Sequence, residues 1–133
     1  MPFVLDASAA LAWALPEQSP AAEAARLRIA ADPALVPALW WFELRNGVIV
    51  NERRGRIAEA ESGRFLQRMS ALPIVFDHSP HETTLMALAR RHRLTVYDAA
   101  YLELALREGV PLATLDEPLA SAAASEGVDL VGG

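Results

Sequence analysis

The 133-residue chain contains no cysteine and no lysine, and aromatic residues make up only 7% of it. The absence of cysteine excludes disulfide bonds, cysteine-ligated zinc, iron–sulfur clusters and a thiol nucleophile. Because all 12 basic residues are arginines, the lysine of a P-loop and Schiff-base chemistry are excluded as well. The chain has no uncharged apolar run of membrane-spanning length, and its start lacks the basic region of a secretory signal. We therefore expect a cytoplasmic protein without a membrane segment.

The remaining composition, 53% hydrophobic and 22% charged, predicts one globular domain over residues 1–133. Short apolar runs alternate with stretches of helical periodicity, which is typical of an α/β fold: a doubly wound parallel sheet of about five strands flanked by helices. The expected strands are Phe3–Leu5, Leu35–Val36, Ile74–Phe76, Leu94–Val96 and Leu112–Thr114, with a weaker sixth at Val128–Val131. The expected helices are Ala21–Ala31, Leu39–Arg54, Ile57–Ala71, Pro80–His92, Ala99–Glu108 and Pro118–Ser125.

Several helix ends carry recognisable signals. Ser79, followed by Pro80 and by Glu82 three residues on, predicts a capping box with proline in the first turn. Glycines stand where three of the helices are expected to stop, at positions 55, 109 and 127.

Three aspartates follow apolar strand-like runs, in the segments FVLD, LTVYD and LATLD, which end at Asp6, Asp98 and Asp116. The carboxyl ends of parallel strands share one edge of the sheet, where ligands bind in a crevice. We therefore expect the three carboxylates to converge there. An aspartate between a strand and a helix is also an ordinary N-cap, and this alternative stays open for each of them.

Glu43 is harder to explain as a cap, because it lies within the apolar segment LWWFEL of a predicted helix. An unpaired carboxylate is costly to bury there, so either an arginine such as Arg45 or Arg53 pairs with it or it serves a site. Four acids at one edge would repel one another unless a cation neutralised them. The chain has no cysteine, and its three histidines are expected at the surface, so the site would consist of carboxylates alone. Such a site suits Mg²⁺ or Mn²⁺, and an ion of this kind with its bound waters suits phosphodiester hydrolysis.

Three segments, VLDASAALAWALPE, LWWFELRN and LTVYDAAYLELALREGVPLATLDEPLA, occur in this order along the chain. Together they closely resemble the PIN-domain ribonucleases of the VapC toxin type. The resemblance implies a PIN-like doubly wound sheet, an acidic metal-binding set of Asp6, Glu43, Asp98 and Asp116, and accessory hydroxyls at Ser8 and Thr114. It also implies a role beside Glu43 for Asn46, one helical turn further on. One departure is Glu117, which stands next to Asp116 and whose role stays open.

The resemblance further implies a Mg²⁺- or Mn²⁺-dependent endoribonuclease that hydrolyses RNA phosphodiesters with a metal-activated water. Such a protein is the toxin of a toxin–antitoxin pair, restrained by a cognate antitoxin protein. Two alternatives remain: a catalytically inactive PIN-like binding module, and an α/β phosphotransfer domain, which the absence of lysine disfavours.

Two surface features point to partners. Arginines cluster at positions 53, 54 and 56 and again at 90, 91 and 93, either to contact RNA phosphates or to complement helix dipoles. The net charge of −5 opposes general nucleic-acid binding. The apolar segment Leu39–Val50 exceeds what one helix face can bury, so we expect a homodimer formed partly by the helix that contains it and the helix that follows. Trp40, Trp41 and Tyr101 are assigned to the core and to this contact.

Overall fold

A computed structural model describes residues 1–133 and contains four strands, seven α-helices and one short 3₁₀ helix. The elements in chain order are β1 (Phe3–Leu5), α1 (Ala7–Leu11), η1 (Ala12–Ala14), α2 (Pro20–Ile29), β2 (Ala34–Pro37), α3 (Trp40–Arg53), α4 (Glu59–Ser70), β3 (Ile74–Asp77), α5 (Glu82–His92), α6 (Val96–Glu108), β4 (Leu112–Ala113) and α7 (Glu117–Ser125). None of the helices has the length and apolar character needed to cross a membrane.

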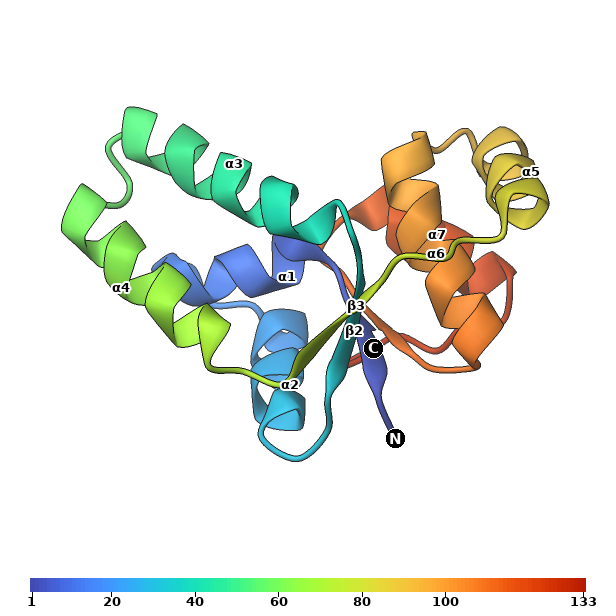
Figure 1. Cartoon of the computed structure of the whole chain (residues 1–133), viewed down its shortest axis with the longest axis horizontal. Helices are drawn as coiled ribbons and strands as arrows, with labels where there is room; N and C mark the ends of the chain where they lie inside the picture. Colours follow the sequence, from blue (N-terminus) through green and yellow to red (C-terminus); the bar gives the residue numbers. More distant parts are fainter.

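The four strands form one parallel sheet in the order β3-β2-β1-β4. Helices α1 to α4 lie on one side of this sheet and α5 to α7 on the other, as Figure 1 shows. The chain winds from β1 to β2 and β3 in one direction and then returns to place β4 on the far side of β1. The strand order therefore reverses between β1 and β4, and the carboxyl ends of these two strands mark the crevice where such sheets bind ligands.

The predicted α/β fold is confirmed, but the sheet has four strands rather than about five. The segment Leu94–Val96 is not a strand, because the Thr95 side chain accepts a hydrogen bond from the Asp98 amide and starts α6 at Val96. The helix thus begins three residues earlier than the predicted Ala99. The expected sixth strand amounts to a single bridge between Leu112 and Leu130.

The predicted capping box at Ser79 is also wrong. Helix α5 begins after His81, whose Nδ1 accepts from the Thr84 amide, while the His81 amide donates to the buried Glu103 at 2.8 Å. The hydrogen bond to Glu103 of α6 holds His81 as the N-cap of α5, two residues beyond Ser79. In contrast, the three expected glycine helix ends are confirmed: residues 55, 109 and 127 all have positive φ, which glycine adopts without steric cost.

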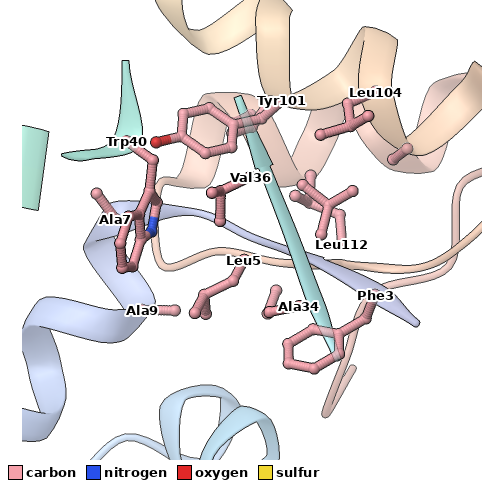
Figure 2. Packing of buried hydrophobic residues seen from close by; sticks show 14 of the residues in the cluster. Phe3, Leu5, Ala7, Ala9, Ala34, Val36, Trp40, Tyr101, Leu104 and Leu112 are labelled. Atoms are coloured by element: carbon pink, nitrogen blue, oxygen red, sulfur yellow. The ribbon is translucent and has the colours of Figure 1, made fainter. Parts of the chain in front are cut away.

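The core lies on both faces of the sheet and is continuous through its central strand. All three residues of β1 are fully buried, and Figure 2 shows Phe3 and Leu5 among residues from β2, α1, α3 and α6. Trp40 and Tyr101 reach this core from α3 and α6, as expected from the sequence, but Trp41 remains 44% exposed. Helix α6 packs against β1, and α3 packs against α1, the helix that directly follows β1.

Candidate active site

The four predicted acids line one cavity of about 210 Å³ at the carboxyl edge of the sheet. The complete lining is Asp6, Ala7, Ser8, Leu11, Glu43, Asp98 and Asp116. No arginine or histidine contributes to it. The structure thus brings together side chains that are as much as 110 residues apart, in a hollow with a strong excess of negative charge.

Each acid reaches the cavity from the beginning of a helix. Asp6 follows β1 and precedes α1, Glu43 and Asp98 lie in the first turns of α3 and α6, and Asp116 is the N-cap of α7. Asp98 therefore does not follow a strand, as the sequence had suggested; the early start of α6 delivers it to the same edge.

The cap alternative applies to one of the three aspartates. Asp116 Oδ2 accepts from the Leu119 amide at 2.9 Å and so caps α7. Asp6 makes no such bond to α1, and Asp98 lies inside the first turn of α6, which Thr95 caps. Capping therefore leaves the placement of Asp6 and Asp98 unexplained.

Asp6 is held by two hydroxyl groups. Its side chain is buried, and Oδ2 accepts from Ser8 Oγ at 2.7 Å and from Thr114 Oγ1 at 2.6 Å. The same hydroxyls accept backbone bonds from the segment between β4 and α7: Ser8 Oγ from the Leu115 amide and Thr114 Oγ1 from the Asp116 amide, both at 3.0 Å. Ser8 and Thr114 therefore fix the position of Asp6 relative to Asp116.

Glu43 is paired with a tyrosine rather than with an arginine. The Tyr101 hydroxyl, from α6, donates to Glu43 Oε1 at 2.5 Å, and the Tyr101 side chain is fully buried. Arg45 and Arg53 form no ion pair with Glu43. From the sequence, Tyr101 was expected in the core and in a subunit contact rather than at the site. Its spacing was the available signal, because it stands one helical turn after Asp98 and therefore on the same face of α6.

Two further residues lie outside the cavity. Asn46 is exposed on α3, one turn beyond Glu43, and does not contribute to the lining. Glu117 is exposed in the first turn of α7, next to Asp116. The structure gives neither residue a contact with the four acids.

The electrostatics of the cavity are those of anions without a counter-ion. Burial raises the pKa of Asp6, Glu43 and Asp98, and repulsion by neighbouring carboxylates raises each of these pKa values further. The hydroxyl bonds to Asp6 and Glu43 act in the opposite direction and offset the rise only in part. At neutral pH this set of carboxylates is destabilised by its own charge.

The donor set is of the kind that a hard divalent cation prefers, since it offers carboxylate oxygens with hydroxyls beside them and no sulfur. Hydrogen bonds within the protein occupy Oδ2 of Asp6, Oε1 of Glu43 and Oδ2 of Asp116. No three of the acids already stand close enough together to form a ready-made metal site. The chemistry of the residues fits a cation, and binding would draw their side chains inward.

Comparison with known proteins identifies the family of the chain. The PIN domain family matches residues 3–125, which include all four acids. Ribonuclease VapC3 of Pyrobaculum aerophilum is 36% identical over 126 residues, covering 90% of this chain and 93% of that protein. The family match extends from β1 to α7.

Solved structures share the fold. PAE2754 from Pyrobaculum aerophilum superposes with a TM-score of 0.71 at 25% identity, over 92% of this chain and 84% of that one. VapC20 of Mycobacterium tuberculosis, described as a toxin that cleaves the sarcin–ricin loop, gives 0.59 at 13% identity, over 92% and 95% of the two chains. FitAcB from Neisseria gonorrhoeae gives 0.66 at 17%, over 97% and 95%. The family match and the identity to VapC3 show that the chain belongs to the PIN domain family and, within it, to the VapC ribonuclease type.

Proposed function

We propose that this protein is a divalent-metal-dependent endoribonuclease that hydrolyses RNA phosphodiester bonds, and that it is the toxin of a toxin–antitoxin pair. The observation that carries the proposal is the cavity in which four carboxylates meet without a basic residue. In a chain of the VapC ribonuclease type, such a cavity needs a cation to bring a phosphate group close to it.

Asp6, Glu43, Asp98 and Asp116 are the residues that would hold the ion, and Mg²⁺ or Mn²⁺ is the cation their oxygens suit. When bound, the ion would supply positive charge for the phosphoryl transition state and would activate a water molecule. Ser8 and Thr114 keep the Asp6 carboxylate turned toward the cavity, and Tyr101 does the same for Glu43. Asn46, exposed one turn along α3, is proposed to contact the RNA beside Glu43.

The proposal is tested by incubating the protein with total RNA in EDTA, in Mg²⁺ and in Mn²⁺. We expect cleavage only with a metal, and we expect Asp6→Asn to abolish it. Asp129→Asn is the matched control, because Asp129 is exposed and lies outside the cavity. If the wild-type protein leaves RNA intact under all conditions while folded, it is a PIN-like binding module instead.

We propose that an antitoxin inhibits the enzyme by neutralising the same four carboxylates. An arginine or lysine of the antitoxin, placed among the four carboxylates, would form charge-assisted hydrogen bonds and exclude the metal. Antitoxin and metal should therefore bind antagonistically. Titrating the antitoxin at increasing Mn²⁺ tests this, and an affinity that does not change up to saturating Mn²⁺ would show that the antitoxin acts elsewhere.

A homodimer remains part of the proposal. Within the expected contact segment, Trp40, Leu44 and Val48 are buried inside the subunit. The apolar side chains left for a subunit contact are Trp41, Phe42 and Ile49, which are 44%, 71% and 41% exposed. Sedimentation velocity at high micromolar concentration distinguishes a dimer from a monomer, and a strictly monomeric protein would exclude it.

A further inference from the structure

Gly47 lies in the interior of α3, where glycine disfavours a helix. It loses more backbone entropy on folding than alanine does, and it contributes no side chain to the packing. Its backbone is helical, and it is not among the glycines with positive φ. The backbone conformation therefore does not require glycine at this position, and the reason for it must lie in packing.

The residue that packs on Gly47 is Leu11, the last residue of α1. Helix α1 lies along α3, as Figure 1 shows. A Cβ atom at position 47 would lie 2.6 Å from Leu11 Cδ2 and 3.4 Å from Leu11 Cδ1. Carbon atoms in contact stand about 3.5–4.0 Å apart, so Leu11 Cδ2 would have to recede by about 1 Å. Gly47 thus leaves a notch in α3 that holds the end of the Leu11 side chain.

Leu11 also lines the acidic cavity. The only other apolar residue of the lining is Ala7, so Leu11 is its one large apolar side chain. Glu43, which lines the cavity as well, stands one helical turn before Gly47 and on the same face of α3. The Leu11 side chain therefore borders both the notch and the hollow that contains the carboxylates.

Filling the notch should move the Leu11 side chain rather than the helices. The three heavy atoms nearest to an added Cβ all belong to the Leu11 side chain, which can rotate. The two helices are held more firmly, because Leu44 of α3 and Ala9 of α1 are fully buried in the core. The open space that Leu11 borders is the cavity, so a Cβ at position 47 would drive Leu11 toward the carboxylates.

We propose that Gly47 is a positioning residue that keeps the Leu11 side chain out of the acidic cavity and so leaves room for the divalent cation. This inference rests on the proposed function, which assigns the cavity to such an ion. Mg²⁺ and Mn²⁺ bind with several waters, so the ion needs space beside the carboxylates as well as their charge. Gly47 does not touch the ion and acts only through Leu11.

The test measures Mn²⁺ binding to Gly47→Ala by calorimetry, without RNA. We expect about a 10-fold loss of affinity, the size typical of residues that place metal ligands without touching the metal. The Tm in EDTA should stay within about 4 °C of the wild-type value, because the better helix propensity of alanine offsets the displacement of one side chain. Gly63→Ala is the matched control, since it makes the same change inside α4, where an added Cβ has nothing within 4 Å. It should leave the Mn²⁺ affinity unchanged.

A double substitution shows whether Leu11 carries the effect. In a Leu11→Ala protein no long side chain remains to be displaced, so the further change Gly47→Ala should not lower the Mn²⁺ affinity again. The proposal is wrong if Gly47→Ala alone binds Mn²⁺ like the wild-type protein, or if its loss of affinity persists in the Leu11→Ala background. A Tm of Gly47→Ala more than about 4 °C below the wild-type value would also overturn it, because α3 as a whole would then have been displaced.

The same measurements distinguish this proposal from the proposed function. A wild-type protein that binds Mn²⁺ but never cleaves RNA would refute the endoribonuclease, while a loss of Mn²⁺ affinity in Gly47→Ala would still support the role of Gly47. A wild-type protein that cleaves RNA, with unchanged Mn²⁺ affinity in Gly47→Ala, would refute the role of Gly47 alone. A wild-type protein that binds no divalent cation would overturn both.

Discussion

The Tyr101–Glu43 hydrogen bond joins the two helices that face each other across the acidic cavity, and Tyr101→Phe removes it with a minimal change of shape. The bond is short, 2.5 Å, and the phenol is fully buried. A hydrogen bond to a charged group contributes about 1.5–3 kcal/mol. Since Glu43 is only half-buried and water can replace part of the lost bond, we expect a loss near the lower end, about 2 kcal/mol.

For a domain of this size each kcal/mol corresponds to about 3–4 °C in Tm, so Tyr101→Phe should melt about 7 °C below the wild-type protein. The functional loss should be larger. A partner that orients a metal-ligating carboxylate typically contributes 10- to 100-fold in metal affinity or activity, and we expect a decrease of this size in Mn²⁺ affinity measured by calorimetry. RNA cleavage at limiting Mn²⁺ should fall in parallel.

Tyr97→Phe is the matched control, because Tyr97 is the only other tyrosine, lies on the same helix, is 62% exposed and makes no side-chain hydrogen bond. It should melt and bind Mn²⁺ like the wild-type protein. The reasoning would be refuted by a Tyr101→Phe protein that loses stability but binds Mn²⁺ with unchanged affinity. In that case Tyr101 would be a core residue whose contact with Glu43 has no part in the site.

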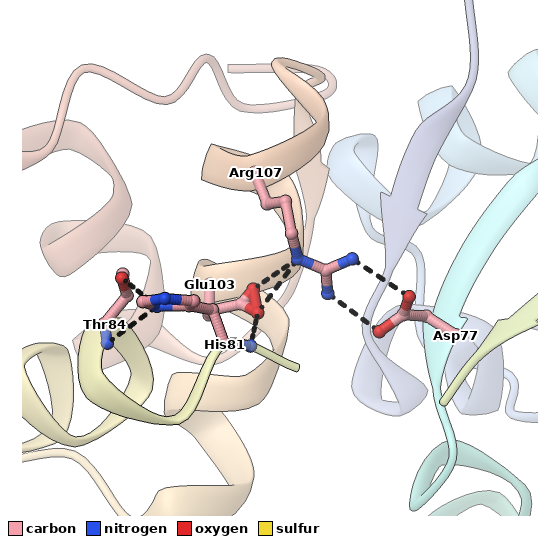
Figure 3. Close-up of polar contacts among 5 residues, drawn as sticks. All are labelled: Asp77, His81, Thr84, Glu103 and Arg107. Atoms are coloured by element: carbon pink, nitrogen blue, oxygen red, sulfur yellow. Dashed lines mark hydrogen bonds and ion pairs between the residues drawn. The ribbon is translucent and has the colours of Figure 1, made fainter. Parts of the chain in front are cut away.

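Three further predictions concern charge. Asp6→Asn should abolish cleavage yet melt at or above the wild-type temperature in EDTA. The amide oxygen still accepts from Ser8 and Thr114, while the repulsion between neighbouring carboxylates is relieved. A melting temperature far below that of the wild-type protein would mean that Asp6 has a structural role. The pKa values of Asp6, Glu43 and Asp98 are higher in the folded than in the unfolded protein. These groups therefore stabilise the metal-free fold fully below about pH 4, and this contribution is lost as the pH rises through their folded-state pKa values. Melts in EDTA from pH 5 to 7 should therefore show a steeper decline for the wild-type protein than for Asp6→Asn, and equal slopes would contradict this origin. Arg107→Gln should lower the free energy of unfolding by about 3 kcal/mol without altering kcat. The substitution leaves the buried Glu103 carboxylate with the His81 amide as its one remaining partner and releases Asp77, as Figure 3 illustrates. A Tm within 2 °C of the wild-type value, about 0.5 kcal/mol, would show that this network contributes little.

The fold was predictable because its strongest signals are local and agree with one another. Each of the four observed strands corresponds to an apolar run, and three glycines mark helix ends at the expected positions. The errors arose where a tertiary or capping contact outweighs a local pattern. The run Leu94–Val96 has the composition of a strand, yet the hydroxyl of Thr95 in its middle caps a helix.

The site was less accessible to sequence reasoning. The sequence predicted the four acids at one edge of the sheet. Asp98 was expected there at the end of a strand, whereas it reaches the edge from the first turn of α6. The pairing of Glu43 with Tyr101 spans 58 residues and has no local signature beyond the position of Tyr101 one turn after Asp98. Likewise, the sequence could not show that Trp41 stays at the surface under Arg45 while its neighbour Trp40 is buried, because this depends on how α3 rests on the sheet.

The position of the acids at helix starts explains how the fold tolerates them and why the proposed function includes a cation. Glu43 and Asp98 lie in the first turns of helices of 14 and 13 residues, and Asp116 caps a third helix. The positive end of a helix dipole favours a nearby carboxylate by about 0.3–1 kcal/mol. Burial and mutual repulsion nevertheless raise the pKa of Asp6, Glu43 and Asp98, so the helix ends reduce the electrostatic cost without removing it. The remaining deficit is local to the cavity, since all of its lining acids face one hollow without a basic residue. Because a divalent ion can neutralise that deficit in a space too small for several monovalent side chains, we expect the same arrangement that weakens the metal-free fold to give the proposed site its affinity for the ion.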